Sequence, residues 1–279
     1  MNKVQDSDTF SAKGVDIGGG VIMYHAVPYG QAPRRGAMQT LHVDLYHPAS
    51  ATGPVPVFVW FHSGAFRSGG YSRVPHKVMA RWLGQRGIAL ATPEYRLGAL
   101  KSDLSPGVLA QLDALRLLRS RKFRRDLAQA RSLAALEDSL EFLSWLDKRR
   151  DDLGVAGKIV LGGSSAGAIN AFNICFTAPY LKLDHAGSFG GIIGFSGGYA
   201  YPSLYEPEKL PIMAAHNPDD DRVSIASIRE LAQRDAMLEL IESREQDHGE
   251  ARLWRNETKA DSFGRIAENV WRMSGVDRV

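Results

Sequence analysis

The stretch that most constrains this chain is residues 159–168, which read Ile-Val-Leu-Gly-Gly-Ser-Ser-Ala-Gly-Ala. An apolar run ends in glycines, Ser165 stands between Gly163 and Gly167, and helix-forming residues follow at once. This is the Gly-x-Ser-x-Gly motif between a strand and a helix, where a sharp turn lifts the serine hydroxyl out of a sheet. Side chains at 163 and 167 would collide with the neighbouring strand and helix, so both positions require glycine. The motif alone is equally typical of a glycine-rich turn with an incidental serine, so the rest of the chain must decide.

Composition limits the classes of protein and of partner. With 279 residues, 44% of them hydrophobic, the chain can bury a large core, and we expect a single α/β domain over residues 1–279. The net charge of +3 is modest and implies no nucleic-acid partner. The single cysteine, Cys175, excludes an internal disulfide and a cysteine-based metal site, and its apolar surroundings predict a buried, inert thiol. Because no run could span a bilayer and the N-terminus lacks an apolar signal core, we expect a cytoplasmic protein. The sequence leaves the oligomeric state open, a homodimer included.

Strand-like and helix-like segments alternate along the chain. Residues 56–61 form a continuous apolar run, as expected of a strand buried on both faces. Besides the run before Ser165, the other expected strands are residues 21–27, 39–46, 88–93, 190–196, 211–215 and 236–241. The expected helices are residues 75–85, 138–153, 223–234 and 259–273, with another starting at Ala166. This alternation predicts a mostly parallel sheet covered by helices on both faces, with the site beyond the carboxyl ends of the strands. The glycines at 18–20 lack the spacing of a dinucleotide fingerprint and predict a flexible loop.

A nucleophilic serine needs a base within hydrogen-bond reach, usually a histidine that a carboxylate orients. Where this motif carries such a triad, the chain order is serine, acid, histidine. After the strand at 211–215 only His216 and His248 remain, and His216 precedes any acid loop. We therefore expect His248 to be the base, although a lone loop histidine is more often a solvated side chain.

The acid is expected in the loop after residues 211–215, which contains three adjacent aspartates. Such a cluster is also typical of a solvated turn, and Asp221 or Ser224 could cap the following helix. We choose Asp220, with Asp219 and Asp221 as alternatives.

An oxyanion that forms on the substrate needs preorganised N–H donors. The N–H of Ala166 is expected to supply one, and Gly64 and Ala65, in the loop after the strand that ends at Phe61, the others. A tight strand-to-helix loop is the structural alternative for Gly64 and Ala65.

Taken in order, these motifs resemble an α/β-hydrolase of the carboxylesterase and hormone-sensitive-lipase-like group. The pieces that carry the resemblance are Asp44-Leu45-Tyr46-His47-Pro48, His62-Ser63-Gly64-Ala65-Phe66, Tyr95-Arg96-Leu97, Glu137-Asp138, Gly163 to Gly167, Asp220 with Val223, and His248-Gly249. The resemblance implies Ser165, Asp220 and His248 as the triad, and Gly64, Ala65 and Ala166 as the oxyanion hole. Ser63 departs from the family's His-Gly-Gly pattern and is strained if its position demands a positive φ. Ala168 stands where the family often has a further glycine.

Two loops also differ from the family pattern. Residues 101–134 form a basic insertion of helical character, which is either a solvated surface helix, a lid, or a patch that attracts anionic substrates. The basic cluster in it consists of Arg121, Lys122, Arg124 and Arg125. The link at 197–210 is too short for a large cap domain. Its tyrosines, Tyr199, Tyr201 and Tyr205, are expected either to line an acyl or sugar pocket or to be exposed.

The sequence therefore predicts a serine esterase that hydrolyses small-molecule carboxylic esters, with a short acyl group such as acetyl and with no metal or organic cofactor. The alternatives are an amidase or peptidase with the same triad, and a non-catalytic binding protein of the same fold.

Overall fold

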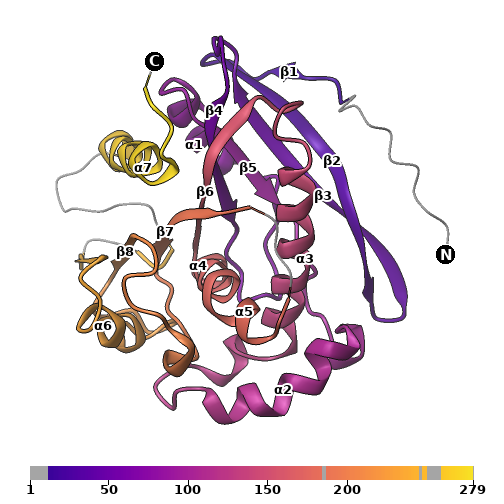
Figure 1. The fold of residues 1–279 in the computed structure, drawn as a ribbon, viewed down its shortest axis with the longest axis vertical. Coiled ribbons are helices and arrows are strands. Elements are labelled where there is room, and N and C mark those ends of the chain that lie inside the picture. The colour runs from indigo at the N-terminus through magenta and orange to yellow at the C-terminus, as the bar shows by residue number, and fades with distance from the viewer. Residues whose placement is uncertain (1–11, 184–186, 245–246, 250–258, 279) are drawn as a thin grey trace.

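The computed structural model describes residues 12–183, 187–244, 247–249 and 259–278. In these residues nine strands form one sheet, in the order β1-β2-β3-β5-β4-β6-β7-β8-β9 (Figure 1). The strands are β1 (Val15–Asp16), β2 (Val21–Arg34), β3 (Ala37–Pro48), β4 (Val55–Phe61), β5 (Ala89–Pro93), β6 (Val155–Ser164), β7 (Phe189–Phe195), β8 (Ile212–His216) and β9 (Leu238–Glu242). Pairing is antiparallel from β1 to β3 and between β3 and β5, and parallel from β5 through β9. The predicted α/β class with a mostly parallel sheet is confirmed.

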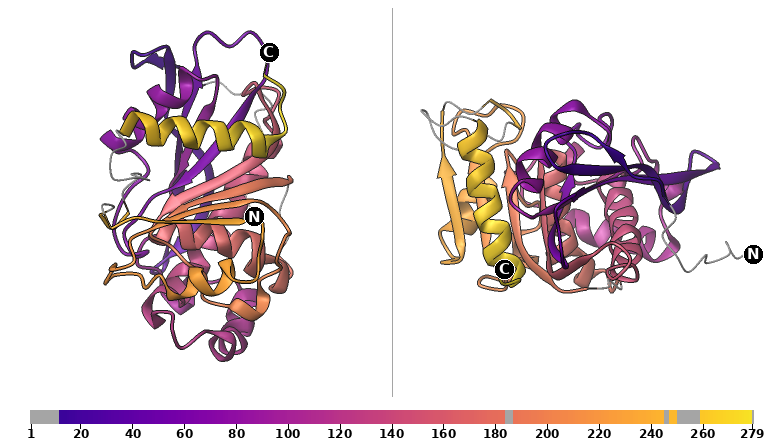
Figure 2. Two further views of the ribbon diagram at one scale, coloured as in Figure 1. Left: turned by 90° about the vertical axis from the view of Figure 1, so that its left-hand side faces the viewer. Right: turned by 90° about the horizontal axis from the view of Figure 1, so that it is seen from above.

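Helices cover both faces of the sheet (Figures 1 and 2). They are α1 (Val74–Gly84), α2 (Pro106–Leu118), α3 (Ala130–Asp147), α4 (Ala166–Phe172), α5 (Ala178–Tyr180), α6 (Ala226–Ala232) and α7 (Lys259–Ser274). Residues of α1 and α7 share one apolar cluster, whereas residues of α3, α4 and α6 belong to the other. Figure 2 shows α7 lying across the face of the sheet that it shares with α1, where it packs on β4, β6 and β7.

Strand β4 shows why its sequence is apolar throughout. Val57 and Val59 point into the cluster under α3 and α4, and Phe58 and Trp60 point into the cluster under α1 and α7. Successive side chains of a strand point to opposite faces, so a strand covered on both faces has no polar alternation. This packing holds the carboxyl end of β4, at Phe61, in the middle of the sheet.

Two helices begin elsewhere than the sequence predicts. Helix α3 spans Ala130–Asp147 rather than 138–153, because its first two turns, with Leu133 and Leu136, are already buried in the core. Helix α6 begins at Ala226 rather than at 223, because Val223 belongs to the preceding loop, where its N–H donates to the Asp220 carboxylate.

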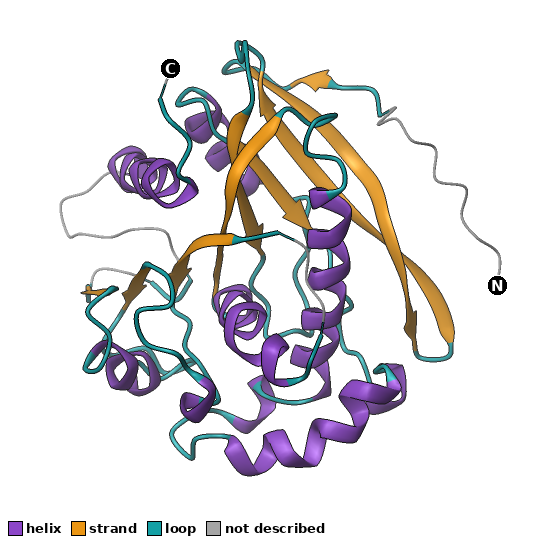
Figure 3. Cartoon of the chain, in the orientation of Figure 1, coloured by secondary structure: helices purple, strands orange, loops and turns teal. Residues whose placement is uncertain are grey.

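The basic insertion contains two short 3-10 turns (Lys101–Asp103 and Arg125–Leu127), helix α2 and the first residues of α3. Val108, Leu112 and Leu115 of α2 are buried, so one face of this helix belongs to the core. Figure 3 shows α2 at the end of the molecule away from α7. In the described parts of the chain, no helix combines the length and hydropathy needed to cross a bilayer.

Candidate active site

The turn at Ser165 has the strained geometry that the motif predicts. Strand β6 ends at Ser164, α4 begins at Ala166, and Ser165 between them adopts φ 52° and ψ −117°. A Cβ on Gly163 would lie 2.6 Å from the carbonyl oxygen of Phe61, and one on Gly167 would lie 1.9 Å from it. Both distances are clashes, which confirms the need for glycine and shows that the end of β4 touches the start of α4.

The structure brings Ser165, His248 and Asp220 into one line of hydrogen bonds. His248 Nε2 lies 3.0 Å from the Oγ of Ser165, and its Nδ1 lies 2.6 Å from Oδ2 of Asp220. With Nδ1–H donating to the carboxylate, Nε2 is left as the acceptor of the serine proton. The next residue is held as well, because the N–H of Gly249 donates to Ser196 Oγ at 2.9 Å. This anchor at Ser196, which the sequence analysis missed, fixes the loop that carries the imidazole.

Among the three aspartates, only Asp220 faces the histidine. Its side chain is completely buried, and its Oδ1 accepts the N–H groups of Arg222 at 2.9 Å and Val223 at 3.0 Å. Burial raises the pKa of Asp220, but the hydrogen bonds from His248 and from the two N–H groups outweigh it and hold the pKa below 3.8. Asp219 is 65% exposed and pairs with Arg244, and Asp221 is exposed. Asp220 is therefore ionised near neutral pH and aligned with the imidazole.

His216 is hydrogen-bonded to the loop that carries Asp220. This buried side chain lies at the end of β8, and its Nε2 donates to the carbonyl of Val223 at 2.8 Å. The same nitrogen is 3.5 Å from Oδ2 of Asp220. Burial lowers the pKa of His216, so the imidazole is neutral near pH 7 and acts as a hydrogen-bond donor within the loop.

The loop after β4 folds as a tight turn beside Ser165. Gly64 adopts φ 126°, and a Cβ there would lie 1.9 Å from the carbonyl oxygen of Ser68. Ala65 and Phe66 also have positive φ, at 52° and 59°. Ser63 has no positive φ, so the strain expected at that residue falls on Ala65 and Phe66 instead.

The expected oxyanion donors, the N–H groups of Gly64, Ala65 and Ala166, form no hydrogen bond with any residue that the structure describes. The carbonyl of Gly64, by contrast, accepts from the N–H groups of Arg67 and Ser68. These two hydrogen bonds occupy the Gly64 carbonyl within the turn. They leave the N–H groups of Gly64 and Ala65 available to another acceptor.

A buried pair stacks behind this loop. The rings of His62 and Tyr95 lie 4.2 Å apart, and the Tyr95 hydroxyl donates to the carbonyl of His62 at 2.7 Å. His62 Nδ1 donates to the carbonyl of Ser63, and burial lowers the pKa of His62 to about 4. The neutral ring therefore positions the backbone that leads into Gly64.

The three tyrosines after β7 are not exposed. Tyr199, Tyr201 and Tyr205 are buried with Phe172 and Phe176 in an aromatic cluster. Tyr199 shares a hydrogen bond with Thr177, and the Tyr205 hydroxyl donates to Asp235. The expectation of exposed loop tyrosines is wrong, and the expectation that they line a substrate pocket stays a prediction. The expected buried thiol is confirmed, since the Cys175 side chain is buried in the core, and this burial raises its pKa to about 12.

The insertion is tied to the loops around the site. The N–H of Ser120 donates to the carbonyl of Ala200, after β7, and Arg124 donates to the carbonyl of Arg222, in the acid loop. Two members of the predicted basic cluster also have acidic partners. Arg124 makes two hydrogen bonds to Asp126, and Lys122 lies 3.4 Å from Glu230.

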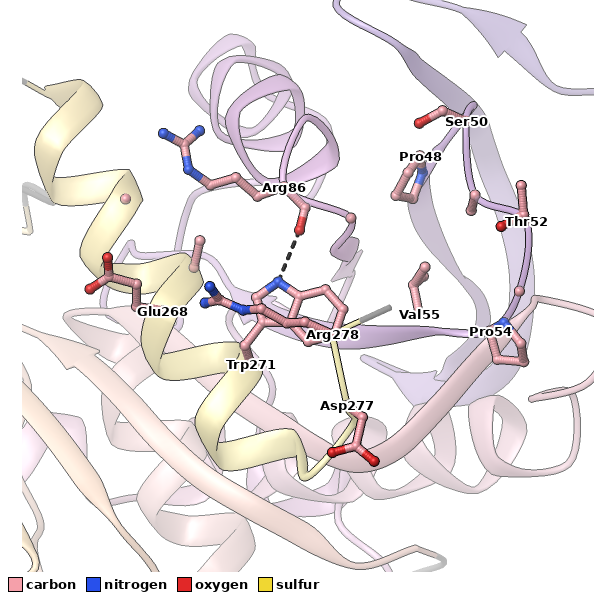
Figure 4. A pocket seen from close by; sticks show the side chains of 15 residues that line it. Pro48, Ser50, Thr52, Pro54, Val55, Arg86, Glu268, Trp271, Asp277 and Arg278 are labelled. Atoms are coloured by element: carbon pink, nitrogen blue, oxygen red, sulfur yellow. Dashed lines mark hydrogen bonds between the residues drawn. The ribbon is translucent and has the colours of Figure 1, made fainter.

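A cavity of about 770 Å³ lies at the end of the sheet where β4 begins, away from Ser165 (Figure 4). Val55, the first residue of β4, lines it together with Trp271, whose Nε1 donates to the carbonyl of Arg86 at 2.9 Å. Because β4 and β6 run parallel, this cavity is separated from Ser165 by the length of the strands. Across the ranges that the structure describes, no three His, Cys, Asp or Glu side chains are grouped to hold a metal ion.

The chain is similar to known proteins both in sequence and in fold. No protein-family model matches the sequence. The chain is 26% identical to carboxylesterase 5A of Ovis aries over 236 residues, which cover 83% of this chain and 52% of that protein. The chain thus spans about half the length of the curated relative that it matches.

Solved structures of similar fold include several esterases. A bacterial heroin esterase matches with a TM-score of 0.62 and 16% identity, over 93% of this chain and 86% of that one. The esterase Est2 of Thermogutta terrifontis, with propionate bound, matches with a TM-score of 0.61 and 17% identity, over 88% and 93%. Esterase Est22 matches with a TM-score of 0.62 and 13% identity, over 90% and 80%. The chain has the α/β-hydrolase fold, and its resemblance to esterases of that fold is confirmed.

Proposed function

We propose that this chain is a serine hydrolase of carboxylic esters. The observation that carries the proposal is the hydrogen-bonded line from Ser165 through His248 to the buried carboxylate of Asp220. A serine hydroxyl becomes an effective nucleophile when a neutral imidazole accepts its proton, and a carboxylate stabilises the imidazolium that results.

In the proposed reaction Ser165 Oγ attacks the ester carbonyl carbon while His248 Nε2 takes the hydroxyl proton. The carbonyl oxygen becomes an oxyanion, which the N–H groups of Gly64, Ala65 and Ala166 stabilise. As the tetrahedral intermediate collapses, the imidazolium returns its proton to the alkoxide, and the alcohol leaves. Water then attacks the acyl-enzyme by the same steps, which releases the carboxylic acid and restores the serine.

The short link between β7 and β8 and one similar solved structure favour a short acyl group. The link between β7 and β8 contains only the 3-10 turn Pro202–Leu204, which leaves no room there for a large cap domain. The similar esterase Est2 of Thermogutta terrifontis was solved with propionate, an acid of this size.

The direct test is hydrolysis of p-nitrophenyl esters of increasing acyl length, from acetate to decanoate, by wild type and Ser165→Ala. We expect the highest kcat/KM at two to four carbons and no turnover above background in the variant. A fluorophosphonate probe should label wild type but not Ser165→Ala. Turnover of peptide anilides without turnover of esters would indicate an amidase instead, and no labelling with no turnover would indicate a binding protein.

A further inference from the structure

A basic pocket lies beside the loop that follows β4. It has a volume of about 480 Å³, and its lining residues come from the tip of the β2–β3 hairpin, the loops after β4 and β5, and the insertion. Its cationic lining residues are Arg35, Arg67, Lys101, Arg116 and Arg131. The rest of the lining is neutral, so no carboxylate of the described residues faces the pocket.

Carboxylates near the pocket offset its charge only in part. Arg116 pairs with Asp113, but Asp113 is 86% exposed, where solvent screens the pair. Asp126 is 3.9 Å from Arg67 but is already bound by two hydrogen bonds from Arg124. One carboxylate is thus shared between two guanidinium groups.

The remaining cations use neutral partners. Arg35 and Arg131 donate to the backbone carbonyls of Gly98 and Asp126. Lys101 has no ion pair with any residue that the structure describes. The nearby carboxylate of Asp103 is buried and accepts the backbone N–H groups of Arg35 and Leu100. The five cationic residues of the lining and Arg124 thus have three carboxylates near them, those of Asp103, Asp113 and Asp126. Because the cationic groups outnumber these carboxylates, the pocket keeps a positive potential.

The pocket adjoins the expected oxyanion donors. Arg67 follows Ala65 by two residues, so their Cα atoms are at most about 7.6 Å apart. On the other wall, the N–H of Gly98 donates to the carbonyl of Phe66 at 2.8 Å. The backbone that carries the expected donor Ala65 therefore continues directly into one wall of the pocket.

We propose that this pocket binds a carboxylate or phosphate group of the substrate, so that the preferred substrates are esters that carry a negative charge. The inference rests on the proposed esterase function and names its substrate class. It also differs from the cluster expected from the sequence, since the pocket draws its charge from five separate segments rather than from Arg121, Lys122, Arg124 and Arg125.

The test uses two pairs of esters that differ in charge. Mono-p-nitrophenyl glutarate and p-nitrophenyl valerate differ by a terminal carboxylate in the acyl part. 1-Acetylglycerol 3-phosphate and 1-acetylglycerol differ by a phosphate in the alcohol part. We expect wild type to favour the charged member of at least one pair by about tenfold in kcat/KM, the effect of about 1.4 kcal/mol at an exposed charged site. The pair that shows the preference identifies which part of the ester carries the charge.

The pocket variant is Arg67→Gln/Lys101→Gln, and the matched control is Arg121→Gln/Arg125→Gln. Both remove two positive charges from exposed side chains, but only the first pair lines the pocket. The charged-to-neutral ratio should fall toward one in the pocket variant and stay unchanged in the control. In wild type it should also fall when ionic strength rises from about 0.05 M to about 0.5 M, because salt screens exposed charges. An equal fall in both variants would show long-range attraction and overturn the pocket.

A binding measurement separates failure of the pocket from failure of the esterase. Glutarate and inorganic phosphate are titrated by calorimetry into wild type and both double variants. We expect binding of at least one anion to wild type and the control, and a Kd at least about fivefold higher in the pocket variant. Hydrolysis of neutral esters with no charge preference would refute this inference and leave the esterase standing. No ester hydrolysis, with anion binding lost only in the pocket variant, would refute the esterase and leave an anion site.

Discussion

Replacing Ser165 by glycine should make the protein more stable than replacing it by alanine, although both variants lose the nucleophile. Ser165 adopts φ 52° and ψ −117°, a conformation that costs a residue with a Cβ about 1–3 kcal/mol. Both variants lose the hydrogen bond to His248, so that contribution cancels in the comparison. Glycine relieves the backbone strain, but its greater unfolded-state entropy and the lost burial of one methyl group together offset about 1.5 kcal/mol.

The net expectation is that Ser165→Gly exceeds Ser165→Ala by about 0.5 kcal/mol in the free energy of unfolding. For a chain of 279 residues this corresponds to about 1 °C in Tm. Differential scanning calorimetry of the two variants, with urea unfolding as the second measurement, resolves a difference of this size. The comparison is matched, because neither variant can form the acyl-enzyme and both keep the same neighbours. Equal stability, or a less stable glycine variant, would refute the argument that the turn stores strain.

Four further predictions concern Asp220, Gly64 and Ser196. Asp220→Asn should lower kcat about 10³- to 10⁴-fold in steady-state assays, because the amide cannot stabilise the imidazolium. Since the folded pKa of Asp220 lies below 3.8, its ionised form stabilises the fold above that pH. The stability difference between wild type and Asp220→Asn in urea unfolding should therefore shrink as pH falls through the folded pKa. Gly64→Ala, whose Cβ would clash with the Ser68 carbonyl, should lower kcat about 10²-fold while the circular dichroism spectrum is kept. Ser196→Ala, which removes the acceptor for the Gly249 N–H, should lower kcat about tenfold with little change in KM.

Chain order alone selected His248, because only one histidine follows the expected acid loop. The choice among the three aspartates could not be derived in that way, since adjacent residues share composition and position. What distinguishes Asp220 is a turn whose N–H groups at Arg222 and Val223 converge on its carboxylate. That convergence depends on backbone angles that no residue pattern in the loop specifies.

The start of α3 was missed for a related reason. Its first turns are nearly all buried, so they show no polar face at helical spacing, and Gln129 before them forms no side-chain cap. The basic pocket was equally hidden, because its cations come from segments as far apart as Arg35 and Arg131. Only the fold brings them to one place, whereas the visible cluster in the insertion is partly neutralised by Asp126 and Glu230.

The order of the strands explains why the site forms where it does, independently of the serine motif. Strands β4 and β6 are neighbours at the middle of the sheet, but the chain leaves β4 toward β5 on one side and leaves β6 toward β7 on the other. Loops that diverge in this way open a crevice beyond the carboxyl ends of the two strands. The Gly64 turn follows β4 and Ser165 follows β6, so the expected oxyanion donors and the nucleophile leave from the two strands at this point. Gly167 allows these two strand ends to lie close together, since without a side chain there α4 packs directly on the carbonyl of Phe61. A side chain at 167 would therefore push the start of α4, which follows the nucleophile, away from the end of β4, which leads to the oxyanion turn.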